Sequence, residues 1–159
     1  MFIFDPHLSL GAPPGFDIHF FKFSLSAKDS VSSKTLRSTY EMLKSNLTGR
    51  HIDYLKMDTK SSGWGVITEI VDSGVLEKVS QLAIQIHFKE GESVEEHRRK
   101  MKILKSIEDF GMVRFSSRPS YSSVAYLRNL KLNGYLVYEL AWYNPLHFFI
   151  WYITSSKNF

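Results

Sequence analysis

Short apolar runs, rich in β-branched and aromatic residues, alternate along this chain with longer segments of helical periodicity. The runs cover residues 1–4, 18–25, 52–57, 82–88, 112–116 and 135–142. Apolar side chains recur at spacings of three and four in the segments between some of them, namely residues 34–46, 64–71 and 92–110. This alternation is typical of α/β proteins, so we expect an open sheet, largely parallel, with flanking helices.

Capping residues and composition refine these elements. Ser33 is the expected N-cap of the first helix, and Gly111 is the expected stop of the longest one. Residues 82–88 are apolar enough to form a central strand. The longest helix is expected to turn four apolar side chains inward, those of Met101, Leu104, Ile107 and Phe110.

The composition indicates one globular domain followed by a short tail. The chain has 159 residues, of which 43% are hydrophobic and none is cysteine. The lack of cysteine excludes a disulfide scaffold, a cysteine-liganded zinc site and a thiol nucleophile. We place the domain at residues 1–144 and assign no role to the aromatic-rich tail at residues 145–159.

The charge pattern does not favour nucleic acid or membranes. The net charge is only +4 and the basic residues are scattered. The single tight basic run, at residues 97–100, follows several glutamates and is interpreted as a solvated helix face. No run is long enough to span a bilayer, residues 1–6 lack a signal-peptide pattern, and the histidines lack the spacing of metal ligands.

Two acidic residues stand where strands end. In an open α/β sheet, ligands bind beyond the carboxyl ends of the strands, and Asp5 and Asp58 both lie there. An acidic residue in this position can accept hydrogen bonds from ribose hydroxyls, so Asp5 is a candidate nucleoside contact. The alternative is that Asp5 only starts a turn before Pro6. The G-x-G-x-x-G pattern of nucleotide-binding loops is absent.

Several motifs in order resemble a known family. Residues 52–58 (IDYLKMD), 81–87 (QLAIQIH) and 138–144 (YELAWYN) look like the motifs "I-D-x-L-K-x-D", "Q-L-x-x-E-I-H" and "Y-E-L-S-W-x-N" of the animal methyltransferase-like 24 group. That group is related to the FkbM-type S-adenosylmethionine-dependent methyltransferases. Residues 4–6 and 24–26 resemble its "F-D-P" and "G-L-S" motifs, so the resemblance runs from residue 1 to about residue 144.

The resemblance implies a class I methyltransferase fold, a Rossmann-like sheet whose last strand is antiparallel. It implies that Asp5 holds the ribose of S-adenosylmethionine, that Ser26 lies near the adenine and that Asp58 faces the methyl-transfer site. It also implies that the family's first strand and Gly-rich loop, which wrap the methionine end of the cofactor, precede the present first strand. We therefore expect weak or absent cofactor binding in this chain, and an unpaired apolar strand edge.

The motifs also depart from the family pattern. Where the family has "D-x-E-G-x-E-W", Lys60, Ser61 and Gly63 replace the first glutamate, the glycine and the second glutamate. Gln85 replaces the glutamate of "E-I-H", which keeps hydrogen bonding but loses charge. The departures leave open whether the chain is a partial methyltransferase, a non-catalytic remnant that acts as a binding module, or an unrelated α/β binding module.

Methyl transfer requires alignment of the acceptor and, for some acceptors, a base. The candidate bases are Asp58 and His87, at the ends of strands that face one crevice. His87 has an alternative interpretation as a hydrogen-bonded structural residue, and Trp64 is expected in the core. The acceptor is not identified by the sequence, and neither is the location, with the secretory pathway open if a preceding region carries a signal or anchor.

Overall fold

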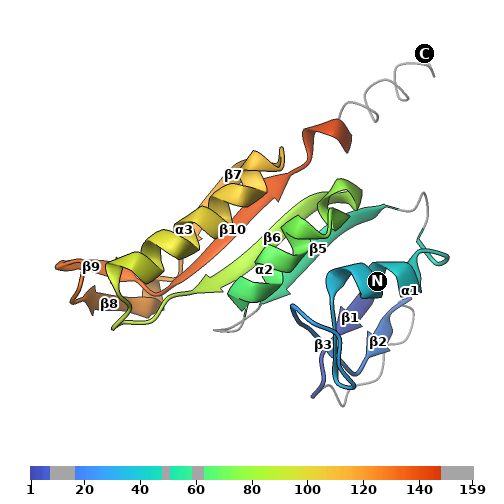
Figure 1. The fold of residues 1–159 in the computed structure, drawn as a ribbon, viewed down its shortest axis with the longest axis horizontal. Helices are drawn as coiled ribbons and strands as arrows, with labels where there is room; N and C mark the ends of the chain where they lie inside the picture. The colour runs from blue at the N-terminus through green and yellow to red at the C-terminus, as the bar shows by residue number, and fades with distance from the viewer. Residues whose placement is uncertain (8–16, 48–50, 59–62, 148–159) are drawn as a thin grey trace.

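A four-stranded mixed sheet forms the centre of the fold in the computed structural model, which describes residues 1–7, 17–47, 51–58 and 63–147 (Figure 1). Its strands lie in the order β5 (Ile52–Asp58), β6 (Val79–His87), β10 (Val137–Tyr143) and β7 (Val113–Pro119). β5 and β6 are parallel, whereas β10 is antiparallel to both of its neighbours. The predicted α/β class and the antiparallel last strand are confirmed, and the sheet is mixed rather than largely parallel.

Two helices cover one face of this sheet. α2 (Gly63–Asp72) follows β5, and α3 (Val94–Asp109) follows β6. A short 3-10 helix, η2 (Val75–Lys78), leads from α2 into β6. In Figure 1 both long helices lie on the same side of the strands.

The core lies between these helices and the two inner strands. Ile67 and Ile70 of α2 and Leu82 and Ile84 of β6 are each about 1% exposed, and Trp142 of β10 is fully buried. The prediction of a central strand at residues 82–88 is confirmed up to His87, where β6 ends, and β6 is paired on both sides. Trp64 is in the core as predicted.

One expectation about α3 is wrong. Leu104 and Ile107 are buried as predicted, but Met101 is 47% exposed. Lys100 is buried instead. Because successive residues are about 100° apart around a helix, Met101 lies to one side of the stripe formed by residues 100, 104 and 107.

The N-terminal part contains two pairs of short parallel strands and one helix. β1 (Phe2–Phe4) pairs with β2 (His19–Phe21), and β3 (Ser24–Leu25) pairs with β4 (Ser33–Lys34). The predicted run at residues 18–25 is therefore divided between β2 and β3. Helix α1 (Leu36–Leu43) follows β4.

The N-cap of α1 differs from the prediction. Ser33 belongs to β4, and the cap is Thr35, whose side-chain oxygen accepts a hydrogen bond from the Ser38 amide at 3.1 Å. Both residues are of types that cap helices, so the sequence alone does not separate them. The pairing of β4 with β3 moves the helix start two residues along the chain.

The long connection between β7 and β10 carries a further hairpin. A short 3-10 helix, η3 (Tyr121–Ser123), leads into β8 (Val124–Leu127), which pairs antiparallel with β9 (Leu132–Tyr135). Lys60 and Ser61, in the motif that departs from the family pattern, and most of the tail at residues 145–159 fall outside the described residues. Within the described part of the chain, no helix is long and apolar enough to cross a membrane.

Candidate functional site

Asp58 and His87 meet at one edge of the sheet. Asp58 is the last residue of β5 and His87 the last of β6. Because these strands are parallel, their carboxyl ends lie side by side, and His87 Nε2 is 3.3 Å from Asp58 Oδ1. The structure therefore brings together the two residues that the sequence placed at one crevice.

Gln85 is the third member of this cluster. It lies opposite Asp58 in the β5–β6 register, and its amide nitrogen is 3.2 Å from His87 Nε2. A protonated Nε2 donates to the Asp58 carboxylate, whereas an unprotonated Nε2 accepts from the Gln85 amide. His87 thus has a partner in either protonation state, which suits a group that takes and returns a proton.

Trp64 fixes the strand end that carries His87. Its indole Nε1 donates to the backbone oxygen of His87 at 3.2 Å. Its ring contacts Phe88, the next residue along, with centroids 5.5 Å apart. Trp64 therefore packs in the core and also joins the start of α2 to the end of β6, where His87 lies.

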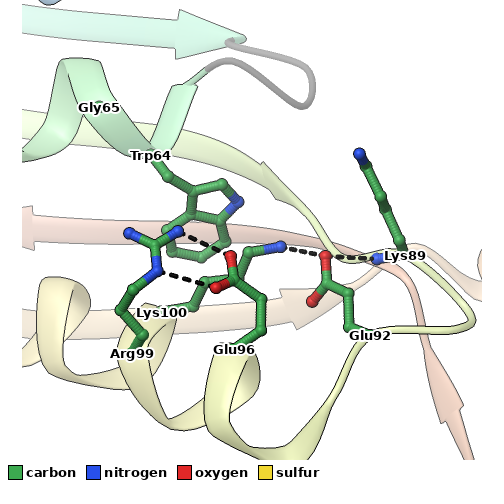
Figure 2. Close-up of a pocket in the computed structure, with 7 residues that line it drawn as sticks. All are labelled: Trp64, Gly65, Lys89, Glu92, Glu96, Arg99 and Lys100. Carbon is green, nitrogen blue, oxygen red and sulfur yellow. Dashed lines mark hydrogen bonds and ion pairs between the residues drawn. The ribbon is translucent and has the colours of Figure 1, made fainter.

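A buried ion pair lies beside Trp64 (Figure 2). The Lys100 ammonium is paired with the Glu92 carboxylate, and both side chains are less than 10% exposed. The ammonium also lies 5.0 Å from the Trp64 ring centroid and 5.4 Å from that of Phe88. The prediction that residues 97–100 form a solvated face is therefore wrong for Lys100, because the carboxylate and the two aromatic faces replace water around it. Arg98 and Arg99 are exposed as predicted.

The second oxygen of Glu92 is less well satisfied. Oε2 is buried and has no hydrogen-bond partner among the described residues. His97 Nδ1 lies 3.6 Å from Oε2, and the His97 ring stacks on Phe88 with centroids 5.1 Å apart. The carboxylate thus receives its strong contacts, from the Lys100 ammonium and the Lys89 amide, on Oε1 alone.

A small cavity of about 360 Å³ adjoins this ion pair. At its rim, Arg99 donates two hydrogen bonds to the Glu96 carboxylate, at 2.9 and 2.7 Å (Figure 2). These hydrogen bonds lower the pKa of Glu96 and raise the pKa of Arg99. The Arg99–Glu96 and Lys100–Glu92 pairs cancel, so the charge left at the cavity is that of the Lys89 ammonium.

The two predicted cofactor residues lie in the N-terminal part. Asp5 follows β1, and its Oδ1 accepts a hydrogen bond from the His7 amide at 2.8 Å, as in an Asx turn. Ser26 follows β3, and its amide donates to the Lys34 oxygen at 2.9 Å. Among the described residues, no hydrogen bond or ion pair joins Asp5 or Ser26 to Asp58 or His87.

The loop after Ser26 does approach the main sheet. A Cβ added at Gly65 would lie 3.5 Å from the Cβ of Ala27, in ordinary van der Waals contact. Gly65 is in the first turn of α2, directly after Trp64. Ser26 therefore lies near the helix that follows Asp58.

One feature of the sequence points to the buried Glu92–Lys100 pair. Lys100 precedes Leu104 by four residues and Ile107 by seven, so it belongs to the apolar stripe of α3. A cation on such a stripe needs a buried anion, and Glu92 lies eight residues before it. Glu92 precedes the Ser93 N-cap, so helical spacing could not indicate where its side chain points.

The chain was compared with protein-family models and with curated proteins, and neither comparison found a match. No family model matches the chain, and no curated protein matches it at a significant level. Among the described residues, no group of three or more histidine, aspartate or glutamate side chains is arranged to hold a metal ion.

Proposed function

We propose that this chain is a partial or degenerate S-adenosylmethionine-dependent methyltransferase domain in which the Asp58–His87 pair serves the methyl acceptor. The observation that carries the proposal is the 3.3 Å contact between His87 Nε2 and Asp58 Oδ1 at the carboxyl ends of two parallel strands. Open α/β sheets bind their ligands at this edge. The antiparallel β10 between β6 and β7 agrees with the sheet that the sequence resemblance implies.

In this proposal His87 removes a proton from the acceptor. Its imidazole is 26% exposed, so it is open to a substrate, while Asp58 stabilises the imidazolium that forms. With its Nε2–H donated to Asp58, the ring takes the acceptor's proton on Nδ1. The bound S-adenosylmethionine would supply an electrophilic methyl group on its sulfonium. The acceptor class stays open, because no described feature distinguishes a sugar from a small molecule or a protein.

Asp5 and Ser26 are the residues proposed to hold the cofactor. Asp5 uses one carboxylate oxygen in its own turn, which leaves Oδ2 without a partner among the described residues. A free carboxylate oxygen fits the ribose hydroxyls of the ligand. The Ser26 hydroxyl is 3.5 Å from the Lys28 amide, a long contact that leaves its proton available.

A non-catalytic binding module is the alternative function. It is favoured by the Asp5 turn, which gives the carboxylate a structural role without any ligand, and by the replacement of motif glutamates at positions 60 and 63. In that case the sheet is retained for a partner, and the Asp58–His87 contact is structural.

Calorimetric titration of the 159-residue chain with S-adenosylmethionine and S-adenosylhomocysteine tests the proposal. We expect weak binding by this chain. In a longer chain that supplies the Gly-rich loop, Asp5→Ala should weaken binding by about 1–3 kcal/mol, because charged hydrogen bonds to the ribose disappear. Asp72→Ala, at the exposed end of α2, is the matched control and should leave the affinity unchanged. No heat at millimolar ligand from folded protein would rule out cofactor binding by this chain and favour the alternative.

A further inference from the structure

A serine and a histidine form a close pair at the end of the sheet opposite Asp58 and His87. Ser80 is the second residue of β6, and His147 lies in the turn that follows β10. Ser80 Oγ is 2.7 Å from His147 Nδ1. Because a strand rises about 3.3 Å per residue, Ser80 lies about 23 Å from His87 along β6. The pair is therefore separate from the proposed methyl-transfer site.

The partners of His147 fix the direction of the hydrogen bond to Ser80. His147 Nε2 is 2.9 Å from the backbone oxygen of Glu77, which can only accept, so Nε2 carries a proton. In the neutral imidazole Nδ1 then has a lone pair, and it accepts a hydrogen bond from the Ser80 hydroxyl. A hydroxyl, a base that can take its proton and a group that orients the base are thus aligned, which is the arrangement of an activated nucleophile.

Backbone hydrogen bonds hold the turn that carries His147. The Asn144 amide donates to the Ser80 backbone oxygen at 2.8 Å, and the His147 amide donates to the Asn144 oxygen at 3.2 Å. The Asn144 side chain is 5% exposed, and its Oδ1 accepts from the Leu146 amide at 3.1 Å. The turn is therefore tied to the start of β6, and the serine and the base are held close together before any substrate binds.

The surroundings of the pair indicate which substrates it can accept. Ser80 and His147 are both half-buried, so neither side chain is sealed from solvent. His51 packs edge-on against His147 with ring centroids 4.6 Å apart. Burial lowers the pKa of His51 below its ordinary value of 6.5, and the nearby charges of His147 and Lys78 lower it further, so the His51 ring is uncharged at neutral pH. An uncharged wall beside the pair favours a neutral substrate over a charged one.

We propose that Ser80 is a nucleophilic serine, that His147 is its general base, and that the pair cleaves small neutral carboxylic esters. Ser80 Oγ forms a bond to the ester carbonyl carbon while its proton passes to His147 Nδ1. That proton then goes to the alcohol oxygen as the bond between this oxygen and the carbonyl carbon breaks, which leaves an acyl group on Ser80. Water, deprotonated by the same nitrogen, attacks the acyl carbon and releases the carboxylic acid, and His147 returns the proton to Ser80. The reaction consumes one ester and one water and needs no cofactor, so it holds whether or not the chain transfers methyl groups.

Labelling with a fluorophosphonate tests the nucleophile. This probe bonds covalently to activated serine hydroxyls, and mass spectrometry identifies the modified residue. Ser106 is the comparator within the same chain, because it is also half-buried and its hydroxyl donates at 2.7 Å to the Ile103 backbone oxygen, which cannot take the proton. We expect Ser80 of the full chain to be labelled at least about a hundredfold faster than Ser106. Equal rates, or no label on Ser80, would overturn the proposal.

Two histidine variants test the base. His147→Asn keeps a side-chain amide that can accept a hydrogen bond from Ser80 but cannot take its proton, so it should slow the labelling of Ser80 at least about a hundredfold. His19→Asn, at an exposed histidine of β2, should leave the rate unchanged. Unchanged labelling in folded His147→Asn protein would mean that His147 only anchors the turn, and would contradict the proposal.

Hydrolysis of p-nitrophenyl acetate tests the substrate class. Ser80→Ala should lower the release of p-nitrophenol by the full chain at least about tenfold, because the acyl group has no serine to occupy. Ser106→Ala is the matched control and should release p-nitrophenol at the rate of the parent. Equal release by the two variants would place the cleavage elsewhere and rule out the Ser80–His147 pair as its source.

Discussion

The four-stranded sheet and the N-terminal strands differ in how completely they are buried. Every residue of the main core cluster lies at or beyond Met57, with the exception of Leu36. In β6, five of nine residues are buried, whereas all three residues of β1 are half-buried. The aromatic side chains of β1 and β2 stack on one another instead, as Phe4 does on Phe21 with centroids 5.2 Å apart.

The difference bears on how each part of the proposed site is held. Asp58 and His87 end two strands of the well-buried sheet, and Trp64 braces one of them. Asp5 and Ser26 follow short strands with much less core beneath them. Positions that need accurate geometry are best supported by packed elements. The Asp58–His87 end of the proposed site is therefore well supported, while the Asp5 and Ser26 end has less packed core to hold it.

The largest effect should come from the centre of the sheet. Trp142 is fully buried and belongs to β10, which lies between β6 and β7. Trp142→Ala should lower the free energy of unfolding by about 5 kcal/mol, because the apolar transfer energy is lost and a cavity is left. Trp142→Phe should cost much less, since the Trp142 indole nitrogen has no hydrogen-bond partner among the described residues. Urea unfolding followed by circular dichroism measures both.

Phe115→Ala is the matched surface control on the neighbouring strand. Its ring is exposed, so the change should stay within about 0.5 kcal/mol. If Trp142→Ala and Phe115→Ala lowered the free energy of unfolding equally, the difference in burial between the centre and the edge of the sheet would not determine how much each residue stabilises the fold.

The next largest effect on stability should come from the buried Glu92–Lys100 ion pair. Lys100→Met leaves the Glu92 carboxylate buried without its cation and should cost about 3–4 kcal/mol. Lys100→Met combined with Glu92→Gln should recover most of that loss, because no unpaired charge remains. A double-mutant cycle in urea unfolding measures the coupling.

The exposed pair on the same helix is the control for this cycle. Lys105 and Asp109 are more than 60% exposed, and their hydrogen bond raises the pKa of Lys105. Lys105→Met should change stability by less than about 1 kcal/mol, since solvent screens the pair. A similar cost for Lys100→Met would mean that Glu92 reaches water when its partner is removed.

The sequence predicted the main sheet better than the N-terminal part, for a physical reason. Strand β6 and helices α2 and α3 bury side chains at regular spacing, so their patterns are strong. The short strands β3 and β4 have two residues each and depend on mutual pairing, which no local pattern reveals. That pairing also moved the helix cap from Ser33 to Thr35.

The candidate site was predictable only in part. Parallel strand ends placed Asp58 beside His87 from the sequence alone. The Glu92–Lys100 pair was not predicted, because a contact between a loop residue and a helix face eight positions away depends on the tertiary fold.

The smallest effect on stability is expected where α1 of the N-terminal part contacts α2. Glu69 of α2 accepts a hydrogen bond from the Leu36 amide, the first residue of α1, at 3.3 Å. Burial raises the pKa of Glu69 above its ordinary value of 4.5, although two backbone hydrogen bonds oppose the shift. A raised folded-state pKa means that the protonated form is favoured by folding, so this stabilisation is full below pH 4.5 and is lost as the pH rises through the folded pKa.

Glu69→Gln keeps the hydrogen-bond acceptor and removes the charge. We expect the variant to be more stable than the parent at pH 7, by at most about 1 kcal/mol because the carboxylate is partly solvated, with a difference that shrinks below pH 4.5. Glu77→Gln, at an exposed position, should show no such pH dependence. Thermal unfolding between pH 4 and pH 7 measures the stability of both variants. A loss of stability in Glu69→Gln at pH 7 would mean that the charged hydrogen bond to the Leu36 amide outweighs the cost of burying the carboxylate. In that case α1 would be held to α2 more firmly than the burial of α1 indicates.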